Sequence, residues 1–142
     1  MTRIDFYVLA DGATGDRLTL ACRIAERAYA DGRRVLIHCP DASLARQIDR
    51  LLWTWREDSF LPHGLVGETD AALTPVLIST DGEPAAEDQV LINLSPEVPE
   101  FFARFERLCE PLDQDPLILK AGRSRWKYYR DCGYDVNHHE VR

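Results

Sequence analysis

Basic side chains are concentrated near the carboxyl end of the chain, where five of them and no acid lie between Leu117 and Arg130. At about 100° per residue, four of them fall within a helical sector of roughly 80°. This basic stripe consists of Lys120, Arg123, Lys127 and Arg130. Trp126 lies on its flank. Three interpretations stay open: a site for an acidic peptide with a hydrophobic end, a site for single-stranded nucleic acid stacked on Trp126, or a solvated face with Trp126 in the core.

A second group of residues suited to binding is aromatic. Trp53, Trp55, Phe60, Leu61 and Pro62 lie within the eleven residues that end at His63, at the end of a predicted helix and in the connection after it. Aromatic side chains on a loop are typical of protein–protein interfaces. The alternative is a loop that folds down over the sheet and covers the core.

A glycine-containing turn, Gly12-Ala13-Thr14-Gly15, follows the first predicted strand. Glycine turns between a strand and a helix can bind phosphate, so a nucleotide-binding, Rossmann-like enzyme is one hypothesis. The turn lacks the third glycine of the dinucleotide motif and the Gly-Lys-Ser/Thr of a P-loop. An ordinary turn between a strand and a helix is therefore the favoured interpretation.

Other residue types give little indication of catalysis. His38 falls in a strand expected to be buried, and His138 and His139 are expected to be mobile near the carboxyl end. The four cysteines are scattered without a CxxC pair, which disfavours a zinc site. No local motif assembles a Ser–His–Asp arrangement. The sequence therefore predicts no catalytic residues, no metal and no cofactor.

Strands and helices alternate in the pattern that must position these residues. Short apolar runs predict strands at 4–9, 35–39, 75–79 and 90–94, and a weak one at 108–112. Capping and periodicity predict helices at 18–30, 42–53, 95–105 and 116–131. Asp81 to Pro84 reads as a turn. The prediction is one Rossmann-like, three-layer α/β domain over 1–142, with a mostly parallel sheet of about five strands. The short link between the third and fourth strands leaves room for an antiparallel pair and a mixed sheet.

Size and composition agree with one globular domain, since the chain has 142 residues, of which 45% are hydrophobic and 29% charged. No apolar run approaches the ~20 residues of a membrane span, and the amino-terminal segment lacks a secretory signal, so we expect a cytoplasmic protein. The net charge is −7, but the charges are distributed unevenly. Residues 1–116 hold 11 basic and 21 acidic residues, whereas residues 117–142 hold 6 basic and 3 acidic residues. Such an acidic protein is not expected to bind DNA non-specifically, because it would repel the phosphates.

Taken in order along the chain, several segments resemble the chi subunit of bacterial DNA polymerase III holoenzyme. The most specific are the block from Trp53 through Ser59-Phe60-Leu61-Pro62-His63 and the final segment, Arg123-Ser124-Arg125-Trp126-Lys127-Tyr128-Tyr129-Arg130-Asp131-Cys132-Gly133-Tyr134. The others are Ile4-Asp5-Phe6-Tyr7, Gly32-Arg33-Arg34-Val35-Leu36-Ile37 and Val90-Leu91-Ile92-Asn93-Leu94. The similarity covers essentially the whole chain.

This resemblance implies a non-catalytic accessory of the clamp loader that contacts DNA only indirectly. Such subunits bind the acidic C-terminal tail of single-stranded-DNA-binding protein, which is of the Asp-Asp-Asp-Ile-Pro-Phe type, and bind the psi subunit on another face. The tail-binding residues it implies are Arg123, Trp126, Lys127 and Arg130. A further basic position of some members aligns with Leu119 here, and Lys120, which is one position on, is the expected substitute in tail binding. The psi-binding residues it implies are Phe60, with Trp53, Pro62 and His63 nearby.

Overall fold

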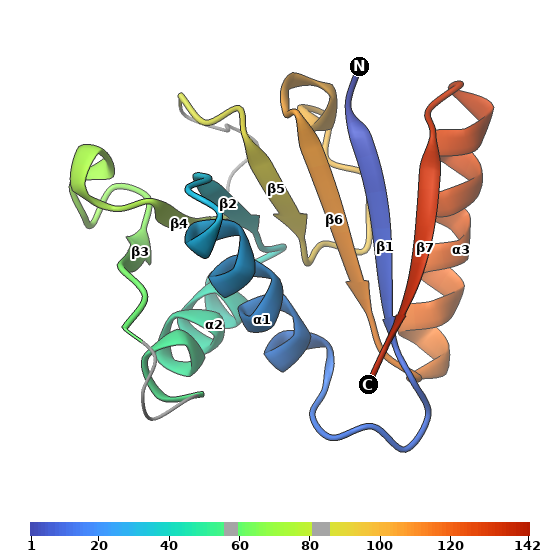
Figure 1. Cartoon of the computed structure of the whole chain (residues 1–142), viewed down its shortest axis with the longest axis horizontal. Coiled ribbons are helices and arrows are strands. Elements are labelled where there is room, and N and C mark those ends of the chain that lie inside the picture. The colour runs from blue at the N-terminus through green and yellow to red at the C-terminus, as the bar shows by residue number, and fades with distance from the viewer. Residues whose placement is uncertain (56–59, 81–85) are drawn as a thin grey trace.

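Seven parallel strands form one sheet in the computed structural model, which describes residues 1–55, 60–80 and 86–142. The strand order in these residues is β3-β4-β2-β5-β6-β1-β7 (Figure 1). The strands are β1 (Arg3–Leu9), β2 (Val35–His38), β3 (His63–Leu65), β4 (Val76–Ser79), β5 (Val90–Asn93), β6 (Arg107–Leu112) and β7 (Val136–Val141). The helices are α1 (Arg17–Ala30), α2 (Ala42–Thr54) and α3 (Pro116–Asp131), with short 3₁₀ turns at Ala71–Leu73 and Phe102–Arg104.

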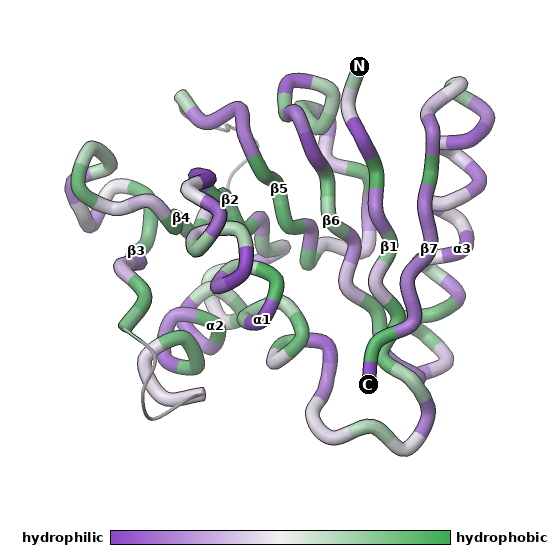
Figure 2. The backbone as a smooth tube through the Cα atoms, viewed as in Figure 1, coloured by the Kyte–Doolittle hydropathy of each residue, from purple (hydrophilic) through white to green (hydrophobic). Residues whose placement is uncertain are grey.

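Helices cover both faces of the sheet, so the predicted three-layer α/β class is confirmed. Helices α1 and α2 lie on one face, and α3 lies on the other face, where it contacts β6 and β7 and is seen partly behind β7 (Figure 1). The central strands β2, β4 and β5 are apolar along their length, as Figure 2 shows. Val35, Leu36 and Ile37 have no exposed surface. Such continuous apolar runs are typical of parallel strands that are buried on both faces.

The ends of three of the four predicted helices, at 18–30, 42–53 and 116–131, are confirmed to within a residue. The Asp16 side chain accepts from the backbone N–H of Thr19 at the start of α1, and the Asp41 side chain accepts from that of Leu44 at the start of α2. Helix α3 begins with the predicted Pro116. These carboxylates satisfy N–H groups that have no partner within the helix.

Two strands were not expected, which is why the sheet has seven strands in the described residues rather than about five. Strand β3 has only three residues, too few for a period-two pattern to stand out. Strand β7 is polar and lies at the sheet edge, where it pairs with β1 over six residues. The expectation of mobile histidines at His138 and His139 was therefore wrong.

Two further local predictions were wrong. Strands β4 and β5 do not pair as an antiparallel hairpin, because β2 lies between them and all three run parallel. The predicted helix at 95–105 is an irregular segment with one 3₁₀ turn at Phe102–Arg104. Its prolines Pro96 and Pro99 lack the N–H that helix bonds require. The predicted turn from Asp81 to Pro84 lies outside the described residues.

A buried carboxylate holds α3 against the sheet. Glu110 of β6 has no exposed surface, and its oxygens accept from Arg125 Nε at 3.1 Å, Tyr129 Oη at 2.7 Å and Asn93 Nδ2 at 3.1 Å. Arg125 also donates to the carbonyl of Pro96 at 2.8 Å. Burial raises the pKa of the Glu110 carboxyl, and the Arg125 charge with the bonds from Tyr129 and Asn93 opposes that rise. These bonds set the rotation of α3 about its axis.

A second buried carboxylate joins β1, β6 and β7 on the opposite face of the sheet. Asp5 lies 2.9 Å from both Arg107 Nε and His139 Nε2 and 3.1 Å from Arg3 Nε. The Tyr7 ring stacks on the His139 ring at 4.7 Å. Burial by itself would raise the pKa of Asp5, but the bonds from His139 and Arg107 and the charges of Arg107 and Arg3 outweigh it. The pKa of Asp5 therefore lies below its ordinary value.

We expect Glu110→Gln to lower the free energy of unfolding by about 3–5 kcal/mol, because it leaves Arg125 buried without its counter-charge. Urea denaturation followed by circular dichroism measures this. The matched control is Glu68→Gln, which breaks the exposed Glu68–Arg46 pair and should change stability little. If the two substitutions lowered the free energy of unfolding by the same amount, the buried Glu110–Arg125 pair would not be a main source of stability.

Asp5 should also contribute to the acid sensitivity of the fold. A carboxyl whose pKa is lowered by folding stabilises the protein above its unfolded pKa of about 4, and this contribution is lost as the pH falls through the folded pKa. We therefore expect Asp5→Asn to be less stable at neutral pH and to lose less stability on acidification than the wild type. Urea titrations across the acid range test this, with the exposed Asp135→Asn as control. Parallel pH curves for Asp5→Asn and the wild type would refute it.

Candidate functional site

The basic stripe borders a pocket between α3 and the β1–β7 end of the sheet. The pocket has a volume of about 490 Å³. Its lining combines apolar side chains of the sheet with residues of one α3 face and one histidine of β7: Phe6, Val8, Leu112, Leu119, Gly122, Arg123, Trp126 and His138. It is thus an apolar hollow with a guanidinium and an imidazole among its walls.

Trp126 is half-buried and forms a wall of this pocket. Its ring meets the Phe6 ring edge-on, with centroids 5.0 Å apart, and lies 6.3 Å from the His138 ring. Trp126 therefore packs on the core and also faces the pocket. The contact with Phe6 fixes the orientation of the indole before any ligand arrives.

Arg123 is exposed, and within the described residues its guanidinium makes no hydrogen bond or ion pair. Lys120 and Arg130 are also exposed, at the positions that the helical spacing predicted. Lys127 differs, since it lies 2.8 Å from Asp131, and this hydrogen bond raises the pKa of Lys127. The fifth base of the segment, Arg125, points the other way and is neutralised by Glu110.

Two residues of this site were not predicted from the sequence. His138 was expected to be mobile, yet strand β7 holds its side chain in the pocket while the next residue, His139, faces Asp5 on the opposite side of the sheet. Gly122 brings α3 close to β6, because an added Cβ would lie 2.6 Å from Leu112 Cδ1. The alternation of side chains in strand β7 could have indicated the position of His138. The glycine inside the last helix could have indicated the close contact at Gly122.

The aromatic group after α2 divides into exposed and buried members. Phe60 is 83% exposed and Trp53 is 60% exposed, whereas Leu61 is buried and Pro62 is half-buried. His63 is buried as well: its Nδ1 lies 2.7 Å from the Leu61 carbonyl oxygen, and its ring lies 4.6 Å from the Trp53 ring. Leu61 therefore covers the core, as one interpretation of this segment predicts, whereas Trp53 and Phe60 face solvent. Ser59 lies outside the described residues.

These two surfaces lie far apart on the molecule. Helix α3 packs on β6 and β7 at one end of the sheet, and α2 packs on β3 and β4 at the other end, on the opposite face (Figure 1). A partner at either surface therefore leaves the other accessible.

The turn at Gly12–Gly15 is not arranged as a phosphate site. Carboxylates already accept from the first N–H groups of α1, with Asp113 on Arg17 N at 3.1 Å and Asp16 on Thr19 N at 3.0 Å. Gly12 and Gly15 have φ of +80° and +97°, which the tight turn itself requires. A phosphate would meet two negative charges here, so the geometry disfavours the nucleotide-binding hypothesis.

No metal-binding cluster stands out in the part of the chain that the structure describes, and three of the four cysteines are buried, while Cys132 is exposed. No group of three or more His, Cys, Asp or Glu side chains in it is placed to hold a metal ion. Burial raises the pKa of Cys22, Cys39 and Cys109 to about 12 each, which makes these thiols inert. None of the described helices combines the length and apolar composition that crossing a membrane requires.

Comparison with solved structures supports the fold alone. The chain superposes on T4 UvsW with a TM-score of 0.68 over 99% of this chain and 41% of that one, at 10% identity. It superposes on domain 2 of the DEAD-box helicase Mss116p bound to an RNA duplex with a TM-score of 0.55, at 9% identity, over 98% of this chain and 64% of that one. Identities this low establish a shared architecture and carry no statement about activity.

Sequence comparison is far more specific. The family model described as DNA polymerase III chi subunit, HolC, matches residues 1–137. The chain is 37% identical to DNA polymerase III subunit chi of Pseudomonas aeruginosa, over 99% of this chain and 98% of that protein. It is 31% identical to the same subunit of Escherichia coli K12, over 96% of this chain and 97% of that protein. On this evidence the chain belongs to the family of DNA polymerase III chi subunits.

Proposed function

We propose that this chain is a non-catalytic connector within DNA polymerase III, which binds the C-terminal tail of single-stranded-DNA-binding protein at the α3 pocket and the psi subunit at Trp53 and Phe60. The observation that supports the first part is the position of Arg123. A guanidinium without an ion-pair partner in the described residues lies at an apolar pocket beside Trp126. This combination suits a ligand that ends in a carboxylate next to an aromatic ring.

The chemistry of such a tail matches the pocket group by group. Arg123 can donate two parallel N–H bonds to the terminal carboxylate, and a charge-assisted bond of this kind contributes about 1.5–3 kcal/mol. The Phe ring can lie against Trp126 and Leu119. Lys120, Lys127 and Arg130 extend the positive charge along the helix toward the aspartates, which mainly increases the association rate. Because these charges are exposed, binding should weaken as salt increases.

Direct binding of single-stranded DNA along α3 is less well supported. Stacking of successive bases requires open aromatic faces, but Trp126 is half-buried against Phe6 and next to His138. The chain also has a net charge of −7, which repels a polymer of phosphates. A short acidic tail needs only one pocket, so DNA is reached through the protein that carries the tail.

The psi-binding surface is supported by two exposed rings, of which Trp53 packs on the buried His63. Trp53 and Phe60 face solvent, while His63 is buried beside Trp53 and holds the chain between α2 and β3 through the Leu61 and Asp49 carbonyls. Large exposed aromatic side chains that are held in place are typical centres of protein interfaces. His63 is thus a supporting residue, and the contact itself falls to Trp53 and Phe60, with Pro62 beside them.

We expect Arg123→Ala to weaken binding of an Asp-Asp-Asp-Ile-Pro-Phe peptide by about tenfold or more, since one charge-assisted pair is lost. Fluorescence polarisation with a labelled peptide measures the affinity. Arg46→Ala, on α2, is the control and should bind normally. Amidation of the peptide terminus should weaken wild-type binding to a similar extent. Equal affinity of Arg123→Ala and the wild type would sink the assignment of this pocket.

Phe60→Ala should release the psi subunit and leave tail binding intact, because the two surfaces lie at opposite ends of the sheet. Co-purification with tagged psi tests the first half and the peptide titration the second. Arg123→Ala is the reciprocal control, which should keep psi. Retention of psi by both Phe60→Ala and Trp53→Ala would show that psi binds elsewhere.

A further inference from the structure

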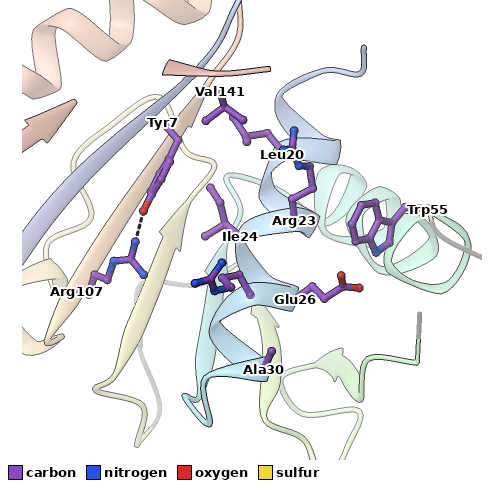
Figure 3. A pocket seen from close by; sticks show the side chains of 10 residues that line it. Tyr7, Leu20, Arg23, Ile24, Glu26, Ala30, Trp55, Arg107 and Val141 are labelled. Atoms are coloured by element: carbon purple, nitrogen blue, oxygen red, sulfur yellow. Dashed lines mark hydrogen bonds between the residues drawn. The ribbon is translucent and has the colours of Figure 1, made fainter. Parts of the chain in front are cut away.

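A third concave surface lies on the face of the sheet opposite α3. No helix of the described residues covers β1 and β7 on the α1 side (Figure 1). A groove of about 570 Å³ lies between α1 and the uncovered strands. Figure 3 shows the side chains that line it. Tyr7, Arg107 and Val141 form the sheet side, and Leu20, Arg23, Ile24 and Arg27 form the helix side. We call this the α1 groove.

The helix side of the α1 groove is a regular stripe. Leu20, Arg23, Ile24 and Arg27 follow the i, i+3, i+4, i+7 spacing of a single helix face. Leu20 and Ile24 are buried, whereas Arg23 and Arg27 are exposed. The aliphatic side chains therefore form the base of this wall, and the two guanidinium groups extend from its rim.

The two rim arginines of the α1 groove, Arg23 and Arg27, have few strong partners, whereas Arg107 is paired with the buried Asp5. In the described residues Arg23 donates one hydrogen bond, at 3.3 Å, to the main-chain oxygen of Arg142, the last residue of the sequence. Arg27 lies 3.5 Å from Asp31, in an exposed pair that contributes little. On the sheet side, one carboxylate, Asp5, serves both Arg107 and Arg3. Glu26 is the acidic residue among the lining side chains. The groove is therefore locally positive on a chain whose net charge is −7.

Guanidinium groups bind carboxylates and phosphates alike, so the surroundings must decide between them. Phosphate sites commonly use backbone N–H groups at a helix start or a glycine turn. The α1 groove lies along the middle of α1 and beside the paired strands β1 and β6, where backbone N–H groups are already bonded. A nucleic acid would also run beyond the groove onto an acidic body. Carboxylates on a short peptide fit better.

We propose that the α1 groove binds an acidic peptide segment of a partner protein, with an apolar side chain between its carboxylates. The carboxylates pair with Arg23 and Arg27 at the rim. The apolar side chain lies against Tyr7, Ile24 and Val141 in the hollow between them. This site differs from the α3 pocket in chemistry, because it recognises acidic side chains within a segment and has no need of a free chain terminus.

A peptide with a blocked terminus separates the two sites. The probe is fluorescein-labelled Glu-Asp-Leu-Phe-Glu-Asp with an amidated carboxyl end, titrated by fluorescence polarisation. We expect binding to the wild type and to Arg123→Ala, and about a tenfold or greater loss in the double variant Arg23→Ala/Arg27→Ala. The isosteric peptide Gln-Asn-Leu-Phe-Gln-Asn should not bind. Both replaced side chains are exposed, and circular dichroism checks that the double variant is folded.

Several outcomes overturn the proposal. They are absence of binding to the wild type, equal binding to the double variant, or loss of binding in Arg123→Ala, which would place the peptide in the α3 pocket. Amide chemical-shift changes in the wild type should centre on Tyr7, Ile24 and Val141. If a single-stranded oligo-dT binds through Arg23 and Arg27 while the acidic peptide does not, the groove is a nucleic-acid site and the proposal fails.

Discussion

The buried contact between Glu110 and Arg125 decides which side of α3 meets solvent. A charged pair in the core requires that its remaining hydrogen-bonding positions are filled, and here Tyr129, Asn93 and the Pro96 carbonyl fill them. With Arg125 and Tyr129 directed inward, helical geometry turns Arg123 and Lys127 outward and places Trp126 at the boundary. The binding chemistry on the outside of α3 therefore depends on a polar network beneath it.

Charge is distributed on this molecule so that an acidic chain still presents positive surfaces. The stripe on α3 and the rim of the α1 groove lie on opposite faces of the sheet, and each combines arginines with an apolar hollow. Strand β7 takes part in both, because its side chains alternate: His138 faces the α3 pocket, and Val141 lines the α1 groove. One edge strand thus helps to shape two surfaces of different character.

The sequence predicted the parts of the fold that depend on local pattern. Apolar runs such as Val35-Leu36-Ile37 mark buried strands, and Asp41 and Pro116 mark helix starts, because capping and periodicity act over a few residues. Strand β7 was missed because its polar residues are stabilised by pairing with β1, more than a hundred positions earlier. The stretch after Ser95 is irregular where the sequence predicts a helix, because Pro96 and Pro99 lack the N–H groups that helix hydrogen bonds require.

For the candidate sites, the sequence by itself determined which residues could share a helix face, since spacing alone aligns Lys120, Arg123, Lys127 and Arg130. Family membership also follows from sequence alone. Only the tertiary structure decided that Arg125 is buried, that His138 completes a pocket, that His63 supports Trp53, and that α1 and β1 border an open groove. Each of these depends on contacts between residues distant in the chain, whose geometry is set when the layers pack and leaves no periodic signal in the sequence.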